Sequence, residues 1–304
     1  MPAFARMRTA PIVAEHRSTR SALPGSAAIP GARSDAAQAG SSGSSATASA
    51  AINLVVATPC FGGQISVLYA ASLFKLQTLL RAYGDVNLKL IFKDGDALIT
   101  RARASLISQF LDDPSATHLL FIDADIGFEP EQVLRLLQCG AEMCAAVYPI
   151  KRIDWDKVKK TIDNARPNPA AASLQYVFEV EDPDAVVASA GFVKVRYAGT
   201  GFLMVRRQAL EKMCAQYPQL KFKRDHSLDA ASASDNRFAL FECMIAEDGT
   251  YLSEDFAFCK RWIDIGGEIW ADLNSKLKHI GPMAFSGDLS SQFQASAPAP
   301  GLAG

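Results

Sequence analysis

The stretch THLLFIDADIGFEP, residues 117–130, decides the fold of this chain. Its apolar run, residues 118–122, has the length and β-rich composition of a buried central strand, and Asp123 and Asp125 follow it directly. Two acids at the mouth of an apolar sheet repel each other and lose hydration, so they stay ionised only beside a cation or strong donors. The pair therefore indicates either a strand end followed by a turn or a divalent metal that bridges to phosphate.

The composition is that of a globular protein with a sizeable core. The chain has 304 residues, of which 49% are hydrophobic and 21% charged. Its formal net charge is −1 and no basic run is dense, so composition gives no support to nucleic-acid binding. No window approaches ~18 uninterrupted apolar residues, and the N-terminus lacks the apolar region of a secretory signal. We expect no transmembrane helix.

The cysteines indicate a reducing compartment. Six are scattered through predicted core elements and none forms a CxxC pair. That spacing suits reduced, packed thiols better than a disulfide framework or a zinc site. The expected location is therefore cytoplasmic.

The chain divides by composition into a folded domain and two extensions. Residues 1–51 contain five Arg, no Lys and two acids, and end in a run of Ala, Ser and Gly, so we expect them to be disordered. Their Arg-rich start also resembles an organelle transit peptide, although Pro2, Pro11 and Pro24 interrupt any amphipathic helix. Residues 52–288 form the predicted domain, with halves at 52–148 and 149–288, and residues 289–304 read as a flexible tail.

The first half alternates strands with helices. Strands are predicted at 52–57, 86–92, 118–122 and 141–148, and helices at 66–83, 97–111 and 130–138. The first helix has a predicted inward stripe of Tyr69, Leu73, Leu76, Leu80 and Tyr83. This alternation is typical of a parallel sheet covered on both faces.

The second half does not continue the regular alternation of strands and helices. Two antiparallel strands are predicted around 174–180 and 193–197, helices at 208–217 and 253–265, and short strands at 268–271 and 276–280. The polar segment 218–250 has weak periodicity and suggests a mobile loop. Ligands of parallel sheets bind outside the carboxyl ends of the strands, which places the loops at 58–63 and 94–96 on one rim with Asp123 and Asp125.

These features together resemble the GT-A class of nucleotide-sugar glycosyltransferases, in particular bacterial and phage members related to family 2. The resembling pieces run in order from 52 to 288: ThrPro (58–59), LLFIDAD (119–125), GlyThrGlyPhe (199–202), SerGluAspPheAlaPhe (253–258) and HisIleGly (279–281). The resemblance implies an α/β fold, with a mostly parallel, Rossmann-like central sheet flanked by helices and a smaller antiparallel part on the acceptor side. It also implies transfer of a sugar from a nucleoside diphosphate to an unknown hydroxyl acceptor, with inversion.

The resemblance assigns a Mn²⁺ or Mg²⁺ ion to the acidic pair. Asp125 would bind it, Asp123 would do so directly or through water, and His279 would be the third protein ligand. Hard oxygen ligands suit both ions, and an imidazole favours Mn²⁺ slightly. The competing interpretation of His279 is a histidine at a strand end near the surface.

The same resemblance places the nucleotide on the early loops. Thr58 and Pro59 would hold the nucleoside together with Asp94 or Asp96, between which the sequence does not choose. Arg101 and Arg103 lie two residues apart on a helix and so face different ways. One would bind diphosphate and the other would be solvated or pair with an acid.

The later motifs have a functional and a structural interpretation. In the resemblance, Gly199, Gly201 and the backbone at Ala124 approach the donor, although GlyThrGly is equally typical of a bulge before a strand. Asp255 would be the base that takes the acceptor proton, and Glu254 an acceptor contact. Acids at a helix start are also stabilised by the helix dipole without any catalytic purpose.

The remaining alternatives come from other classes. Lys151, Arg152 and Trp155 follow the fourth strand and indicate either a phosphate or sugar contact or a charged turn with a packed indole. A haloacid dehalogenase-like phosphatase also has DxD after a strand, but normally after the first strand. A nucleotidyltransferase would need a Gly-rich first loop with Arg and Lys. A GT-A domain that binds sugar or protein without turnover is the non-enzymatic alternative.

Overall fold

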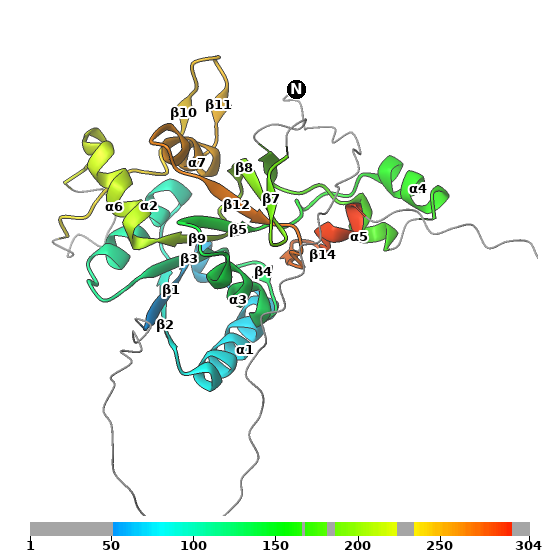
Figure 1. Cartoon of the computed structure of the whole chain (residues 1–304), viewed down its shortest axis with the longest axis horizontal. Coiled ribbons are helices and arrows are strands. Elements are labelled where there is room, and N and C mark those ends of the chain that lie inside the picture. The colour runs from blue at the N-terminus through cyan, green and yellow to red at the C-terminus, as the bar shows by residue number, and fades with distance from the viewer. Residues whose placement is uncertain (1–50, 166–167, 181–185, 224–233, 294–304) are drawn as a thin grey trace, which may run out of the picture. The chain divides into compact units, whose positions relative to one another are not determined.

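The computed structural model describes residues 51–165, 168–180, 186–223 and 234–293 (Figure 1). The predicted disorder before residue 51 lies outside these ranges, as do most of the predicted C-terminal tail and the middle of the predicted loop at 218–250.

A mixed β-sheet organises the described residues. Within them the sheet has nine strands in the order β2-β1-β3-β9-β5-β12-β8-β6, with β7 paired to β8. The strands are β1 (Ile52–Pro59), β2 (Val86–Lys93), β3 (His118–Ile122), β5 (Met143–Ala146), β6 (Phe178–Val180), β7 (Ala188–Ser189), β8 (Phe192–Ala198), β9 (Phe202–Arg206) and β12 (Ile269–Asp272). The predicted α/β class is confirmed.

Strand β9 makes the sheet mixed rather than continuously parallel. Strands β2, β1 and β3 are parallel neighbours, but β9 lies antiparallel between β3 and β5. Its residues 202–205 are buried, as a central strand requires. The sheet that we expected to be mostly parallel is thus mixed and partly parallel, because a strand from the second half inserts between two strands of the first.

Helices cover both faces of the sheet. On one face lie α1 (Val67–Tyr83) and α3 (Pro130–Cys139), and on the other α2 (Ile99–Leu111), α6 (Arg207–Gln216) and α7 (Glu254–Asp264). Ser66 caps α1 by accepting a hydrogen bond from the Tyr69 amide, and Gly84 ends it in the left-handed conformation. Four of the five predicted α1 stripe residues are buried, whereas Tyr83 is 56% exposed.

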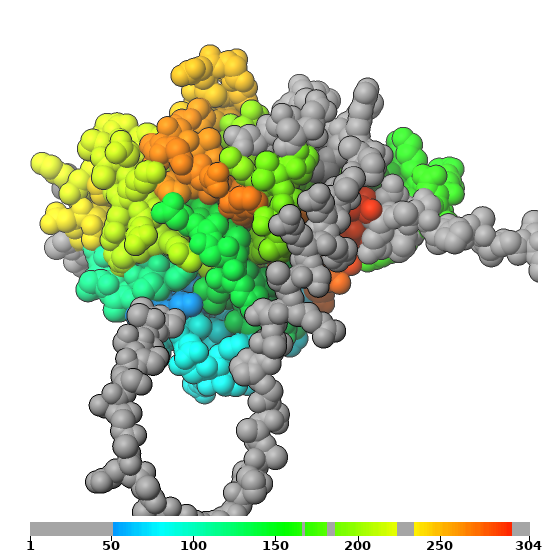
Figure 2. Space-filling model, viewed as in Figure 1, coloured from blue at the N-terminus to red at the C-terminus, as the bar shows by residue number. Residues whose placement is uncertain are grey.

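Shorter elements complete the described residues. They are helices α4 (Trp155–Asp163) and α5 (Pro169–Ser173), which we did not predict, 3₁₀ turns at Phe61–Gly63, Pro218–Leu220 and Leu289–Gln292, and two small sheets. One sheet pairs β10 (Met244–Ile245) with β11 (Tyr251–Leu252), and the other joins β14 (Ala284–Ser286), β13 (Lys278–Ile280) and β4 (Ile126–Gly127). Figures 1 and 2 show the β10–β11 hairpin standing out beyond α7. None of the described helices is long and apolar enough to span a bilayer.

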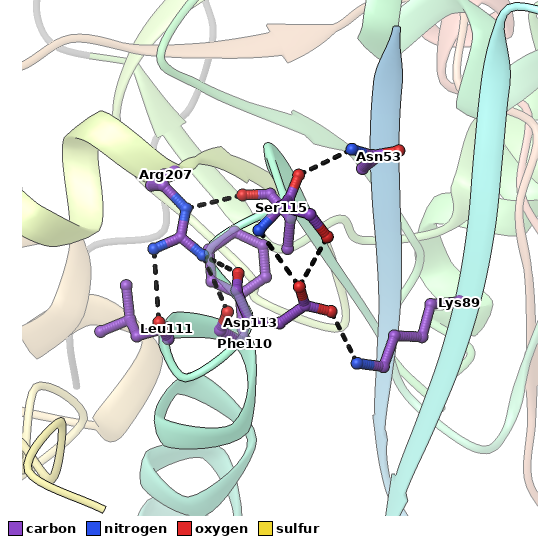
Figure 3. Close-up of polar contacts among 8 residues, drawn as sticks. Asn53, Lys89, Phe110, Leu111, Asp113, Ser115 and Arg207 are labelled. Carbon is purple, nitrogen blue, oxygen red and sulfur yellow. Dashed lines mark hydrogen bonds and ion pairs between the residues drawn. The ribbon is translucent and has the colours of Figure 1, made fainter.

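Arg207 ties the end of α2 to the start of α6 (Figure 3). Its guanidinium donates hydrogen bonds to the carbonyls of Ala116 at 2.6 Å and Phe110 at 3.0 Å, and also to that of Asp113. Asp113 in turn accepts from Lys89 of β2 at 2.7 Å. This network closes the carboxyl terminus of α2, whose carbonyls have no helical partners.

Candidate functional site

The sheet places the predicted site residues along one edge. Strands β1, β2 and β3 are parallel, so their carboxyl ends lie at the same edge, where β9 begins beside the end of β3. Strand β13 pairs with β4, and this puts His279 opposite Ile126, next to Asp125. The structure therefore brings the acidic pair, the GlyThrGly loop and His279 together.

Asp125 is contacted by two basic side chains. Its Oδ2 accepts a hydrogen bond from the Lys151 ammonium, and its Oδ1 lies 3.4 Å from Nε2 of His279. Burial alone would raise the pKa of Asp125, but His279 and Lys151 outweigh it and hold the pKa below its ordinary value. Asp125 is therefore a carboxylate that Lys151 and His279 stabilise.

His279 has the orientation that a metal ligand needs. Its Nδ1 lies 2.8 Å from the carbonyl of Pro149, which only accepts hydrogen bonds, so Nδ1 carries the proton. Nε2 then faces Asp125 Oδ1, either with a second proton or with a lone pair. Two ligand atoms on one ion, with bonds of about 2.1 Å, lie about 3.0–3.5 Å apart. The observed 3.4 Å fits a divalent ion bound by both groups.

Asp123 is neutralised by a different cation. Arg103 of α2 donates from Nη2 to Asp123 Oδ1 at 2.8 Å, and its guanidinium lies over the rings of Phe121 and Phe241. In the described ranges no three His, Cys, Asp or Glu side chains converge as a metal site. Of the three residues expected to bind the ion, Asp125 and His279 face each other, whereas Asp123 is engaged by Arg103.

Tyr148 fills the space beneath the GlyThrGly loop, a role that we did not predict. Its hydroxyl accepts a hydrogen bond from the Gly201 amide at 3.1 Å, and its ring meets His279 edge-on at 5.2 Å. A Cβ at Gly199 would lie 2.3 Å from that hydroxyl, and one at Gly201 would lie 2.7 Å from Asp123 Oδ2. Packing against Tyr148 and Asp123 therefore requires both glycines. The only sequence feature that pointed to Tyr148 was its position at the end of the fourth predicted strand, residues 141–148.

The nucleotide-side residues separate into internal and exposed groups. Thr58 is fully buried and its hydroxyl bonds to that of Tyr69, while Asp96 binds Arg101 through both oxygens at 2.7 and 2.8 Å. Asp94 lies on the exposed part of the same loop. Pro59 is buried, and the carbonyl of Ala124 accepts from the Ser66 amide at 2.8 Å. Arg101 and Arg103 thus each pair with an acid.

Two carboxyls open helix α7. Asp255 accepts hydrogen bonds from the Ser253 hydroxyl and, at 2.9 Å, from the Phe256 amide. Burial raises the pKa of Glu254, and the charge of Asp255 raises it further. Arg103 and Asp123 also act on this pKa, so Glu254 lies within electrostatic range of the acidic pair.

Comparisons with known proteins give weak likenesses. No protein-family model matches the chain, and no curated protein matches it. Among solved structures, A197 from STIV is 15% identical with a TM-score of 0.41, covering 83% of this chain and 100% of that one. UDP-glucose pyrophosphorylase complexed with UDP-glucose is 9% identical with a TM-score of 0.36, covering 81% and 97%. The 4-diphosphocytidyl-2C-methyl-D-erythritol synthase from Anaerococcus prevotii DSM 20548 is 12% identical with a TM-score of 0.30, covering 71% and 100%. Likenesses of this size identify no family.

Proposed function

We propose that this protein is a metal-dependent glycosyltransferase that moves a sugar from a nucleoside diphosphate to a hydroxyl acceptor, with inversion. The observation that carries the proposal is the pair of Asp125 Oδ1 and His279 Nε2, 3.4 Å apart at the carboxyl edge of the sheet. A bound Mn²⁺ or Mg²⁺ supplies a Lewis acid that neutralises charge on the departing diphosphate. The order of motifs along the chain, which resembles GT-A enzymes, supports the same assignment.

The chain's own residues have distinct roles in this proposal. Asp125 and His279 hold the ion, and the Pro149 carbonyl keeps the imidazole in the required tautomer. Arg103 fixes Asp123 beside them. The exposed loop around Asp94 contacts the nucleoside, because Asp96 is already bound by Arg101.

Asp255 is the proposed base, by the resemblance. It lies on the first turn of α7, next to Glu254, whose raised pKa makes it the second candidate. We expect Asp255→Asn to abolish transfer and to leave donor binding unchanged, with Glu254→Gln retaining measurable transfer. The reverse pattern would assign the base to Glu254.

Metal and donor binding test the proposal directly. Mn²⁺ binding to the purified full chain can be followed by the loss of the free-ion EPR signal, and turnover with a panel of UDP-, GDP-, ADP- and CDP-sugars. We expect Asp125→Asn to weaken Mn²⁺ binding by about tenfold or more and to remove turnover. Asp163→Asn, at an exposed acid paired with Lys159 on α4, is the matched control and should behave as the wild type.

Other outcomes would identify the alternatives. A wild type that binds neither Mn²⁺ nor any sugar nucleotide contradicts the proposal. Release of phosphate from a simple monoester without a sugar nucleotide would indicate a phosphatase. In such phosphatases the acidic motif normally follows the first strand, whereas Asp123 and Asp125 follow β3, the third strand along the chain. Donor binding without turnover in the presence of varied acceptors would indicate a binding module.

A further inference from the structure

Lys151 makes a contact at the acidic pair that the proposed metal site does not explain. It follows β5 in the segment that also contains Pro149, and its ammonium donates to Asp125 Oδ2. Its stem packs beside the residue after β13, since a Cβ at Gly281 would lie 3.1 Å from Lys151 Cδ. The two partners of this ion pair are 34% and 37% exposed.

We propose that Lys151 is a built-in counter-ion, which holds Asp125 while no metal is bound and transfers to the donor diphosphate when metal binds. This inference rests on the proposed function. An ammonium and a divalent ion on one carboxylate repel each other, so binding of metal at Asp125 weakens the attachment of Lys151. The diphosphate that arrives with the metal offers the ammonium a new anionic partner within the same site.

The second cation of the site differs from Lys151 in its freedom to move. Arg103 is 2% exposed and its planar guanidinium lies over the rings of Phe121 and Phe241, so it stays with Asp123. Lys151 has a flexible four-carbon stem and a compact charge with rotatable donors. Of these two cations, Lys151 is the one suited to change partners.

The competing explanation is an ordinary surface salt bridge. Exposed ion pairs contribute little to stability, and an ordinary salt bridge would involve no contact between Lys151 and a bound diphosphate. The two explanations therefore differ in what removal of the ammonium does to the affinity for a nucleoside diphosphate at saturating Mn²⁺. Removal of the ammonium also removes a positive charge that repels the metal at Asp125, so Mn²⁺ binding becomes tighter.

The experiment measures Mn²⁺ binding by EPR for the full-length wild type, Lys151→Met and Lys159→Met. Lys159 pairs with Asp163 on the exposed surface of α4, so Lys159→Met removes the same charge away from the site. We expect Lys151→Met to tighten Mn²⁺ binding about 3- to 10-fold relative to Lys159→Met. In a second arm at saturating Mn²⁺, we expect Lys151→Met to weaken binding of the preferred nucleoside diphosphate about 10-fold and to leave the corresponding nucleoside unaffected.

The outcomes separate this inference from the proposed function. If Asp125→Asn loses Mn²⁺ binding but Lys151→Met matches Lys159→Met in Mn²⁺ affinity, the metal site stands and the counter-ion role of Lys151 is overturned. Tighter Mn²⁺ binding without weaker diphosphate binding overturns the transfer to the donor. If neither wild type nor Lys151→Met binds Mn²⁺, the proposed function fails together with this inference.

Discussion

At the scale of single residues, the two acids Asp123 and Asp125 have basic partners that differ in burial and in mobility. Asp123 meets the buried, stacked guanidinium of Arg103, and Asp125 meets the half-exposed ammonium of Lys151 together with His279. The backbone turns between the two acids, and the Ile126 amide closes this turn with a hydrogen bond to the Asp123 carbonyl at 3.0 Å. One acid is thereby built into the protein and the other remains available to a ligand.

His118 provides a test of the pH dependence of stability. It opens β3 opposite Arg206, and burial, together with that arginine, lowers its pKa to about 4. An unfolded histidine titrates near pH 6.5, so the unfolded chain takes up this proton first as the pH falls. The stability from neutral His118 is thus complete above about pH 6.5 and is lost progressively toward pH 4.

We expect the free energy of unfolding of the wild type to fall by about 2 kcal/mol more than that of His118→Gln between pH 6.5 and 4. Urea unfolding at several pH values, followed by circular dichroism, measures both proteins. Carboxylates titrate in the same window and affect the two proteins equally, so the difference between the curves reports His118. Parallel curves over that window would contradict the expectation.

The need for cations beside Asp123 and Asp125 was predictable from the sequence, because adjacent acids at an apolar strand end require compensation. Which cations supply it was not. Arg103 lies 20 residues before Asp123, and Lys151 lies 26 residues after Asp125. Their spacing on one helix showed only that Arg101 and Arg103 point in different directions. The packing of α2 against the sheet determines that Arg101 pairs with Asp96 and Arg103 with Asp123.

At the scale of elements, β9 and β13 assemble the site. Strand β9 begins at the edge where β3 ends, so the Asp123 amide donates to the Gly201 carbonyl at 2.9 Å. Strand β13 pairs with β4, and the Ile280 amide donates to the Asp125 carbonyl at 2.8 Å. A short strand was predicted at 276–280, where β13 lies, and a strand after GlyThrGly, where β9 lies, was one of two interpretations of that loop. The neighbours of these strands were not predicted, since pairing between strands far apart in sequence depends on the whole topology rather than on local pattern.

The junction of α2 and α6 gives the prediction for this scale. Arg207 supplies donors to carbonyls at the end of α2, and its side chain is 18% exposed. Arg207→Met should lower the free energy of unfolding by about 2–4 kcal/mol, because those partly buried carbonyls lose charged donors. Chemical denaturation measures the change, and Arg207→Lys should recover part of it.

Arg196→Met is the matched control for Arg207→Met. Arg196 pairs with Glu179 on the surface and its side chain is 48% exposed, so its loss should change stability by less than about 1 kcal/mol. Equal effects of the two methionine substitutions would show that Arg207 is only another surface charge.

At the scale of the whole molecule, the two predicted halves depend on each other. Strands β1, β2, β3 and β5 come from residues 52–148, yet β9 from residues 149–288 separates β3 from β5 and pairs with both. The core beneath helices α6 and α7 likewise joins residues of both halves. Neither half forms the complete sheet alone. Asp125 comes from the first half, whereas His279 and Gly201, which belong to the same candidate site, come from the second. A linear alternation of strands and helices predicted the class but not this interdependence.

This interdependence predicts where the chain tolerates truncation. The buried residues of both core clusters lie between Leu54 and Leu289, and every residue of the candidate site lies within the same limits. We therefore expect a chain of residues 51–304 to unfold cooperatively, with a Tm within about 2 °C of the full chain, and to bind Mn²⁺ equally well. A chain of residues 52–148 should show no cooperative transition, because without β9 the facing edges of β3 and β5 keep unpaired backbone groups. Calorimetry of the three proteins measures this, and a large fall in Tm for residues 51–304 would show that the first 50 residues contribute to the core.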